Sequence, residues 1–155
     1  FTVEFHNFSC VLLNPTLVLQ LDCILHKKSI APSISVIFKL TKQVNEFNLL
    51  YHLQVLKMDD SKMTIARHKL DGCKFLASLY SQSIMAKFFK RIRSVSNLPK
   101  KCPVPGNKLF EIRNYTVLAE EYPPNVPAMS YEFRMKIEYR SKVVAEIIVI
   151  GNISY

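Results

Sequence analysis

A strict alternation of apolar and polar side chains over residues 130–140 constrains this chain more than any other feature of its sequence. In an extended segment, one face would carry the apolar residues Tyr131, Phe133, Met135, Ile137 and Tyr139. The opposite face would carry Glu132, Arg134, Lys136, Glu138 and Arg140. Because successive side chains of a β-strand point to opposite faces, this pattern predicts a strand with one buried face and one face in water.

Three further segments alternate in the same way. Their inward faces are predicted to carry Leu17, Leu19, Leu21, Cys23 and Leu25, then Ile34, Val36, Phe38 and Leu40, and then Phe47, Leu49, Tyr51, Leu53 and Val55. Turns are expected at Asn14-Pro15, at Ala31-Pro32 and at residues 58–61, and residues 143–150 are predicted to form a last strand. Such spacing is typical of an antiparallel all-β sandwich or barrel, and a chain of 155 residues is expected to form one domain, 1–155.

One segment lacks the alternation. From Cys73 to about residue 94, helix-forming residues dominate, and Asp71 precedes them as a candidate N-cap. Phe75, Leu76 and Leu79 share one face of this helix. The sequence therefore predicts a mainly β fold with a helical insert around residues 73–94.

Four cysteines form an even set that suits two disulfides. Of the three possible pairings, the favoured one joins Cys10 to Cys23 across the first turn and Cys73 to Cys102 across the helical insert. These bonds are expected to be structural, because no Cys-x-x-Cys redox motif is present. A cytosolic protein with buried thiols is the alternative.

Three N-glycosylation sequons begin at Asn7, Asn114 and Asn152. Together with the paired cysteines and a first residue that is not methionine, they favour a secreted, extracellular glycoprotein whose signal peptide has been removed. Asn7 has the same strand parity as Val3 and Phe5, so either a bulge turns it outward or this site is unused.

The net charge of +9 is concentrated in one basic patch that contains no acidic residue. Its members are Lys87, Lys90, Arg91, Arg93, Lys100 and Lys101. For a secreted protein, an anionic membrane surface or an acidic receptor is a more suitable partner than nucleic acid, which is not expected to bind. Phe88 and Phe89 lie within the patch, so this segment is expected either to touch lipid head groups or to pack on a sheet.

The sequence lacks the patterns that accompany catalysis or metal binding. Three glycines are too few for a glycine-rich phosphate loop, and no Gly-x-Ser-x-Gly elbow occurs. The four histidines do not have the spacing of metal ligands. The chain is therefore expected to be a non-enzymatic protein that uses no cofactor and no metal.

Three short stretches resemble a family of small secreted insect proteins of unknown function. They are Asp71-Gly72-Cys73-Lys74-Phe75-Leu76, Ser96-Asn97 and Cys102-Pro103-Val104-Pro105-Gly106. That family is similar to the CheB chemosensory proteins and, more remotely, to the ganglioside activator and the lipid-recognition (ML-like) β-sandwiches. The resemblance implies a cup-like β-sandwich whose sheets part to admit an apolar ligand, such as a lipid, a fatty acid, or a cuticular hydrocarbon or pheromone.

The residues expected to line such a cavity are Phe38, Leu40, Leu49, Tyr51, Leu53, Phe75, Leu79, Tyr131, Phe133 and Met135. The same side chains would equally fill a solid sandwich core. The leading hypothesis is a secreted carrier or presenter of a hydrophobic small molecule, with the resemblance implying a role in chemosensation. The alternative is a protein–protein interaction module, a ligand or co-receptor with a filled core, and a glycan or ganglioside binder would combine the two.

Overall fold

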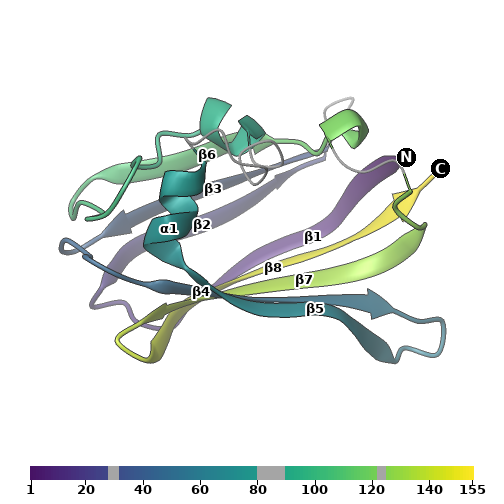
Figure 1. Cartoon of the computed structure of the whole chain (residues 1–155), viewed down its shortest axis with the longest axis horizontal. Helices are drawn as coiled ribbons and strands as arrows, with labels where there is room; N and C mark the ends of the chain where they lie inside the picture. Colours follow the sequence, from purple (N-terminus) through teal and green to yellow (C-terminus); the bar gives the residue numbers. More distant parts are fainter. Residues whose placement is uncertain (28–31, 80–89, 122–124) are drawn as a thin grey trace.

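The computed structural model describes residues 1–27, 32–79, 90–121 and 125–155, which form two antiparallel sheets packed as a sandwich (Figure 1). The larger sheet has the strand order β1-β8-β7-β4-β5, and the smaller sheet has the order β2-β3-β6. The strands of the larger sheet are β1 (Thr2–Leu12), β4 (Asn48–Leu56), β5 (Lys62–Asp71), β7 (Met129–Tyr139) and β8 (Lys142–Ser154). Those of the smaller sheet are β2 (Val18–His26), β3 (Ser33–Leu40) and β6 (Leu109–Tyr115). The predicted antiparallel β-sandwich is confirmed.

The helical insert begins where the sequence predicts. Helix α1 (Gly72–Ser78) follows Asp71, whose carboxylate accepts hydrogen bonds from the backbone N–H groups of Cys73 and Lys74 at 2.9 and 3.1 Å. Residues 90–94 are also helical, and the middle of the predicted insert lies outside the described residues. A short 3₁₀ helix, η1 (Ala119–Glu121), precedes β7. Within the described ranges, no helix has the length and apolarity needed to cross a membrane.

A β-bulge in β1 settles the orientation of the first sequon. The register between β1 and β8 shifts between Phe5 and Asn7, so that Phe5 and Phe8 are both buried. Asn7 is consequently exposed. Of the two alternatives that the parity allowed, the structure has the bulge.

A second bulge corrects the predicted inward face of β2. Leu19 was expected to point inward with Leu17 and Leu21, but it is 56% exposed. The register between β2 and β3 shifts between Val18 and Gln20, so both Leu17 and Val18 are buried and Leu19 turns outward. One extra residue in a strand reverses the parity of everything that precedes it, which alternation alone cannot reveal.

Both favoured disulfides are present. Cys10 and Cys23 join β1 to β2 with their Cα atoms 5.6 Å apart, so this bond ties together neighbouring edges of the two sheets. Cys73 and Cys102 join the start of α1 to the segment before β6, with a Cα–Cα distance of 5.4 Å. The two bonds therefore hold the sheets at one edge and fix the helical insert at the other.

Two groups of buried side chains make up the interior between the sheets. The first comprises Leu17, Val18, Val44, Leu76, Val104, Phe110 and Val144. The second comprises Phe5, Phe8, Val36, Tyr131 and Val149. Phe38 and Leu21 pack against both groups, so the interior is continuous from one end of the sandwich to the other.

Candidate ligand-binding cavity

A cavity of about 190 Å³ lies between the two sheets, within the first group of core residues. The smaller sheet and its flanks contribute Leu17, Val18, Leu21, Val36, Phe38, Leu40 and Ile112. The larger sheet contributes Leu49, Met135, Ile137, Tyr139, Val144, Ala145 and Ile147. The remaining wall consists of Val44, Phe47, Phe75, Leu76, Leu98, Pro99 and Val104.

This remaining wall comes from α1 and two connecting segments rather than from a strand. Phe75 and Leu76 project from α1, while Val44 and Val104 exchange two backbone hydrogen bonds of 2.9 and 2.8 Å. Cys102 anchors the second segment to α1 through its disulfide with Cys73. The two backbone hydrogen bonds and the disulfide thus fix this wall to the rest of the fold.

The lining has almost no polar chemistry. Tyr139 carries the one ionisable group among the described residues that line the cavity, and the other lining side chains are apolar. Lys42 and Arg140 lie over the ring of Tyr139, with their charged groups 5.6 and 5.2 Å from its centroid. Such a lining can surround an apolar molecule, and its described residues include no acid–base pair.

Five of the ten residues predicted to line a cavity do line this one: Phe38, Leu40, Leu49, Phe75 and Met135. The other five, Tyr51, Leu53, Leu79, Tyr131 and Phe133, are not part of its wall. Those on strands share the inward face that the alternation predicts, but they lie away from the cavity.

Most of these five belong to the second core group. Tyr131 is buried there, with Leu53 and Phe133 packed against the group. Tyr51 lies between His68 and Phe133, with ring centroids 5.5 and 6.1 Å away. Leu79, at the end of α1, is fully buried outside the cavity wall.

Burial also explains the chemistry of Tyr131. Its hydroxyl donates a hydrogen bond to the backbone oxygen of Glu4 at 3.4 Å, and burial raises the pKa of its phenol well above the ordinary value. This tyrosine is a neutral core residue and not an acid or base of the cavity.

Sequence reasoning missed several lining residues that carried a readable signal. Ile137 and Tyr139 lie on the inward face defined by the alternation of residues 130–140, immediately after Met135. Val144, Ala145 and Ile147 gave no such signal, because β8 is apolar on both faces.

The predicted basic patch is divided in the folded chain. Lys90, Lys100 and Lys101 are exposed, whereas Arg91 and Arg93 are partly buried. Lys87, with Phe88 and Phe89, lies outside the described residues. Residues 95–97 pair with β6 and separate the helical members from Lys100 and Lys101, which flank the disulfide at Cys102.

The three sequon asparagines differ in their surroundings. Asn7 and Asn114 are exposed, and the backbone N–H of Asn114 donates to the hydroxyl of Ser35 at 2.9 Å. Asn152 is partly buried, and its side-chain oxygen is hydrogen-bonded to the His6 ring.

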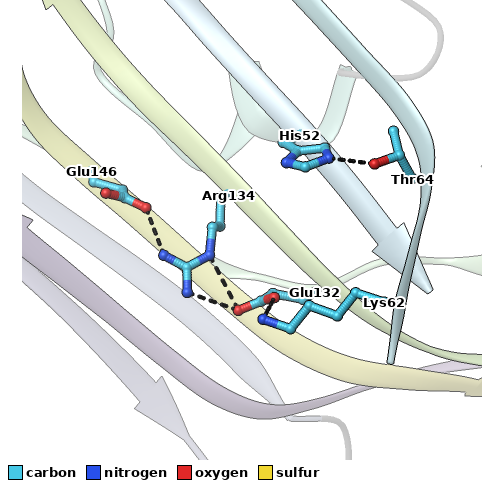
Figure 2. Close-up of polar contacts among 6 residues, drawn as sticks. All are labelled: His52, Lys62, Thr64, Glu132, Arg134 and Glu146. Carbon is cyan, nitrogen blue, oxygen red and sulfur yellow. Dashed lines mark hydrogen bonds and ion pairs between the residues drawn. The ribbon is translucent and has the colours of Figure 1, made fainter. Parts of the chain in front are cut away.

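The face of the larger sheet that points away from the cavity carries an ion-pair network (Figure 2). Glu132, whose side chain is 4% exposed, pairs with Lys62 at 2.7 Å and with Arg134 at 3.0 Å. Arg134 extends the network to Glu146 at 2.9 Å, and His52 is hydrogen-bonded to Thr64 beside it. These residues cover the sheet on its outer side, so the network stabilises the wall of the cavity without reaching into it.

The network controls the ionisation of Glu132. Burial by itself would raise the pKa of this carboxyl group, but hydrogen bonds from Lys62 and Arg134 outweigh it. The pKa of Glu132 therefore lies below its ordinary value, and the carboxylate is charged at neutral pH. The hydrogen bond to Glu146 in turn raises the pKa of Arg134.

Comparison with known families finds one that matches the chain. Residues 51–133 match DUF1091, a family described as a protein of unknown function. The chain belongs to this family. A search of curated proteins found no match to the chain. The DUF1091 region runs from the middle of β4 to the middle of β7, so it contains α1, the disulfide between Cys73 and Cys102, and β6.

The described part of the DUF1091 chain holds no cluster of three or more His, Cys, Asp or Glu side chains arranged to bind a metal ion. Its most distinctive chemical feature is the apolar cavity.

Proposed function

We propose that this chain is a secreted, non-enzymatic carrier of a small, uncharged, apolar molecule. The observation that carries the proposal is the cavity of about 190 Å³, in whose wall the described residues include no charged side chain. A charged group placed inside it would lose its hydration without gaining a partner, which costs several kcal/mol or more. A neutral hydrocarbon-like molecule has no such cost and gains about 0.8 kcal/mol for each methylene group that it buries.

The size of the cavity narrows the class of ligand. An apolar protein cavity of roughly 150 Å³ stays free of water and takes up benzene or xenon. The present cavity is slightly larger, which suits one small ring or a short aliphatic chain. A small volatile hydrocarbon fits this description better than a long-chain cuticular hydrocarbon or a complete membrane lipid.

The proposal also draws on the resemblance to the CheB chemosensory proteins and to the lipid-recognition sandwiches. Two disulfides and two exposed sequon asparagines, Asn7 and Asn114, support a secreted glycoprotein. A chemosensory role in an insect is the biological setting that the resemblance favours.

Native mass spectrometry of protein from a eukaryotic secretory host, followed by organic extraction, tests the proposal. A stoichiometric apolar compound should be bound, or the emptied protein should take up an uncharged fluorescent dye. Uptake of a fatty-acid probe in preference to the uncharged dye would contradict the neutral-ligand assignment. A protein that takes up neither probe would refute the carrier function.

A protein–protein interaction module is the second candidate, and the edge strand β5 favours it. Met63 and Ile65 are 45% and 49% exposed on this strand, which pairs only with β4. An open edge with exposed apolar side chains is suited to pairing with a partner strand. Failure of both ligand tests, together with capture of a receptor that Met63→Lys abolishes, would establish this second function.

A further inference from the structure

Four connections meet at one end of the sandwich, opposite the two chain termini (Figure 1). They are residues 13–17, 41–47, 99–108 and 140–141, between consecutive strands or before β6. Backbone hydrogen bonds link three of them: Thr41 donates to Leu17 at 2.8 Å, and Val44 and Val104 exchange two bonds of 2.9 and 2.8 Å. Leu13 also donates to Val144 of β8 at 3.0 Å, close to the turn at residues 140–141. The four connections therefore lie together at this end, and three of them are bonded directly to one another.

This surface is strongly cationic. Its exposed cations are Lys42, Lys100, Lys101, Lys108, Arg140 and Lys142, and we refer to it as the basic end. Glu46 is the one carboxylate in these connections, all of which the structure describes. Only Lys100 and Lys101 belong to the basic stretch that is visible in the sequence. Lys108 follows them in the same connection, and the fold adds Lys42 from residues 41–47, and Arg140 and Lys142 at the turn between β7 and β8.

Several of these cations are fixed against aromatic rings of the interior. Lys42 and Arg140 lie over Tyr139, and Lys108 lies 5.4 Å from the ring centroid of Phe110. In such cation–π contacts the charged group itself lies over the ring, which restricts the positions that these side chains adopt. The basic end thus presents its charges in a preorganised arrangement.

Exposed leucines accompany the cations. Leu12 and Leu13 are 40% and 52% exposed beside the 140–141 turn, and Leu109 is 42% exposed after Lys108. A surface of cations interspersed with apolar side chains matches the interface of an anionic bilayer, where lysines meet head groups and leucines enter the acyl boundary. An acidic protein partner is the alternative, and the vesicle experiment below distinguishes it from a bilayer.

We propose that the basic end docks on an anionic lipid bilayer. At the described part of the opposite end, the exposed carboxylates Asp59, Asp60 and Glu120 are balanced by the exposed Lys27, Lys57 and Lys62. The excess positive charge therefore lies at the basic end, and an anionic surface would orient the molecule with that end toward it. The proposal does not depend on a ligand in the cavity.

Vesicle co-sedimentation of the full chain tests it, using phosphatidylcholine vesicles with and without phosphatidylserine. The triple variant Lys42→Glu, Lys101→Glu and Lys142→Glu changes one cation in each of two connections and one at the start of β8. Because each basic residue near an anionic membrane contributes roughly 1 kcal/mol, its partition coefficient should fall by roughly 100-fold or more. Binding of the unaltered chain should weaken as salt is added.

The matched control is the triple variant Lys57→Glu, Arg67→Glu and Lys136→Glu, which changes the net charge equally but alters exposed residues away from the basic end. It should keep most of the binding, while Leu13→Ser should reduce the binding that persists at high salt. Circular dichroism and thermal unfolding establish that each variant is folded. Equal losses in the two triple variants would overturn the proposal, since only net charge would then matter. Binding to soluble polyglutamate but not to vesicles would overturn it in favour of an acidic protein partner.

Discussion

Filling the cavity with a larger side chain should stabilise the ligand-free protein, because the added atoms would occupy space that is now empty. Ala145 is the smallest side chain in the wall and is buried on β8. Ala145→Leu adds three carbon atoms, which contribute about 2.4 kcal/mol at about 0.8 kcal/mol each when buried. The loss of side-chain rotamer freedom offsets about 0.5–1 kcal/mol of this gain.

The expected net increase in the free energy of unfolding is therefore about 1.5 kcal/mol. For a protein of this size, the melting temperature should rise by about 3–6 °C. Chemical denaturation of delipidated protein measures the free energy directly. In a core that is already full, the same substitution would force side chains out of their rotamers and cost about 1–3 kcal/mol. The sign of the change in the free energy of unfolding therefore distinguishes an empty cavity from a filled core.

Ligand binding provides a second readout of the same variant. An uncharged dye at 100 times its dissociation constant should stabilise the unaltered protein by about 2.7 kcal/mol. Ala145→Leu should lose this response, whereas the control Ala66→Leu, on β5 and outside the cavity wall, should retain it. A destabilised Ala145→Leu variant, or one that still binds the dye as tightly as the unaltered chain, would refute the reasoning.

Three further substitutions test the scaffold by chemical denaturation. Glu132→Gln should cost about 2 kcal/mol at neutral pH, because it removes charged hydrogen bonds from a buried carboxylate. The pKa of Glu132 is lower in the folded chain than in the unfolded chain, where it is near 4.5. The contribution of Glu132 to the free energy of unfolding is therefore complete above the unfolded pKa and is lost as the pH falls through the folded value. The Glu132→Gln variant should accordingly lose less stability in acid than the unaltered chain. Replacing Cys73 and Cys102 by serine opens a loop with a sequence separation of 29 and should cost about 3–4 kcal/mol, with weaker dye binding because the cavity wall loosens. Gly151→Ala should cost about 2–3 kcal/mol, since an added Cβ would overlap the backbone oxygen of Glu4, and an unchanged denaturation midpoint would contradict this packing.

The alternation of side chains predicted the sandwich because it reports directly which face of a strand is buried. It placed Tyr131 and Phe133 inside and Glu132 outside, as observed. It could not show that Glu132 is itself buried, since that burial depends on Lys62 from a strand two positions away in the sheet. Long-range pairing of this kind leaves no local trace in the sequence.

Strand β6 escaped prediction for a different reason. Its inward face is short, with Phe110 fully buried and Ile112 in the cavity wall, while Leu109 beside them is exposed. Asn114 then adopts a left-handed conformation with φ of 52°, and the register with β3 shifts nearby. Two inward apolar residues in succession are too few to distinguish a strand from an extended connection.

The cavity lies where a helix and a connecting segment contribute to the wall between the sheets. Two sheets that pack directly interdigitate their side chains and leave little space, as in the second core group around Tyr131. At the cavity, Phe75 and Leu76 of α1 and the segment before β6 complete the wall, and a helix cannot follow the pleat of the facing sheets. The disulfide between Cys73 and Cys102 fixes that wall, and both cysteines fall within the region that matches DUF1091. The segment that matches DUF1091 thus supplies α1 and the segment before β6, the part of the cavity wall that does not come from a strand.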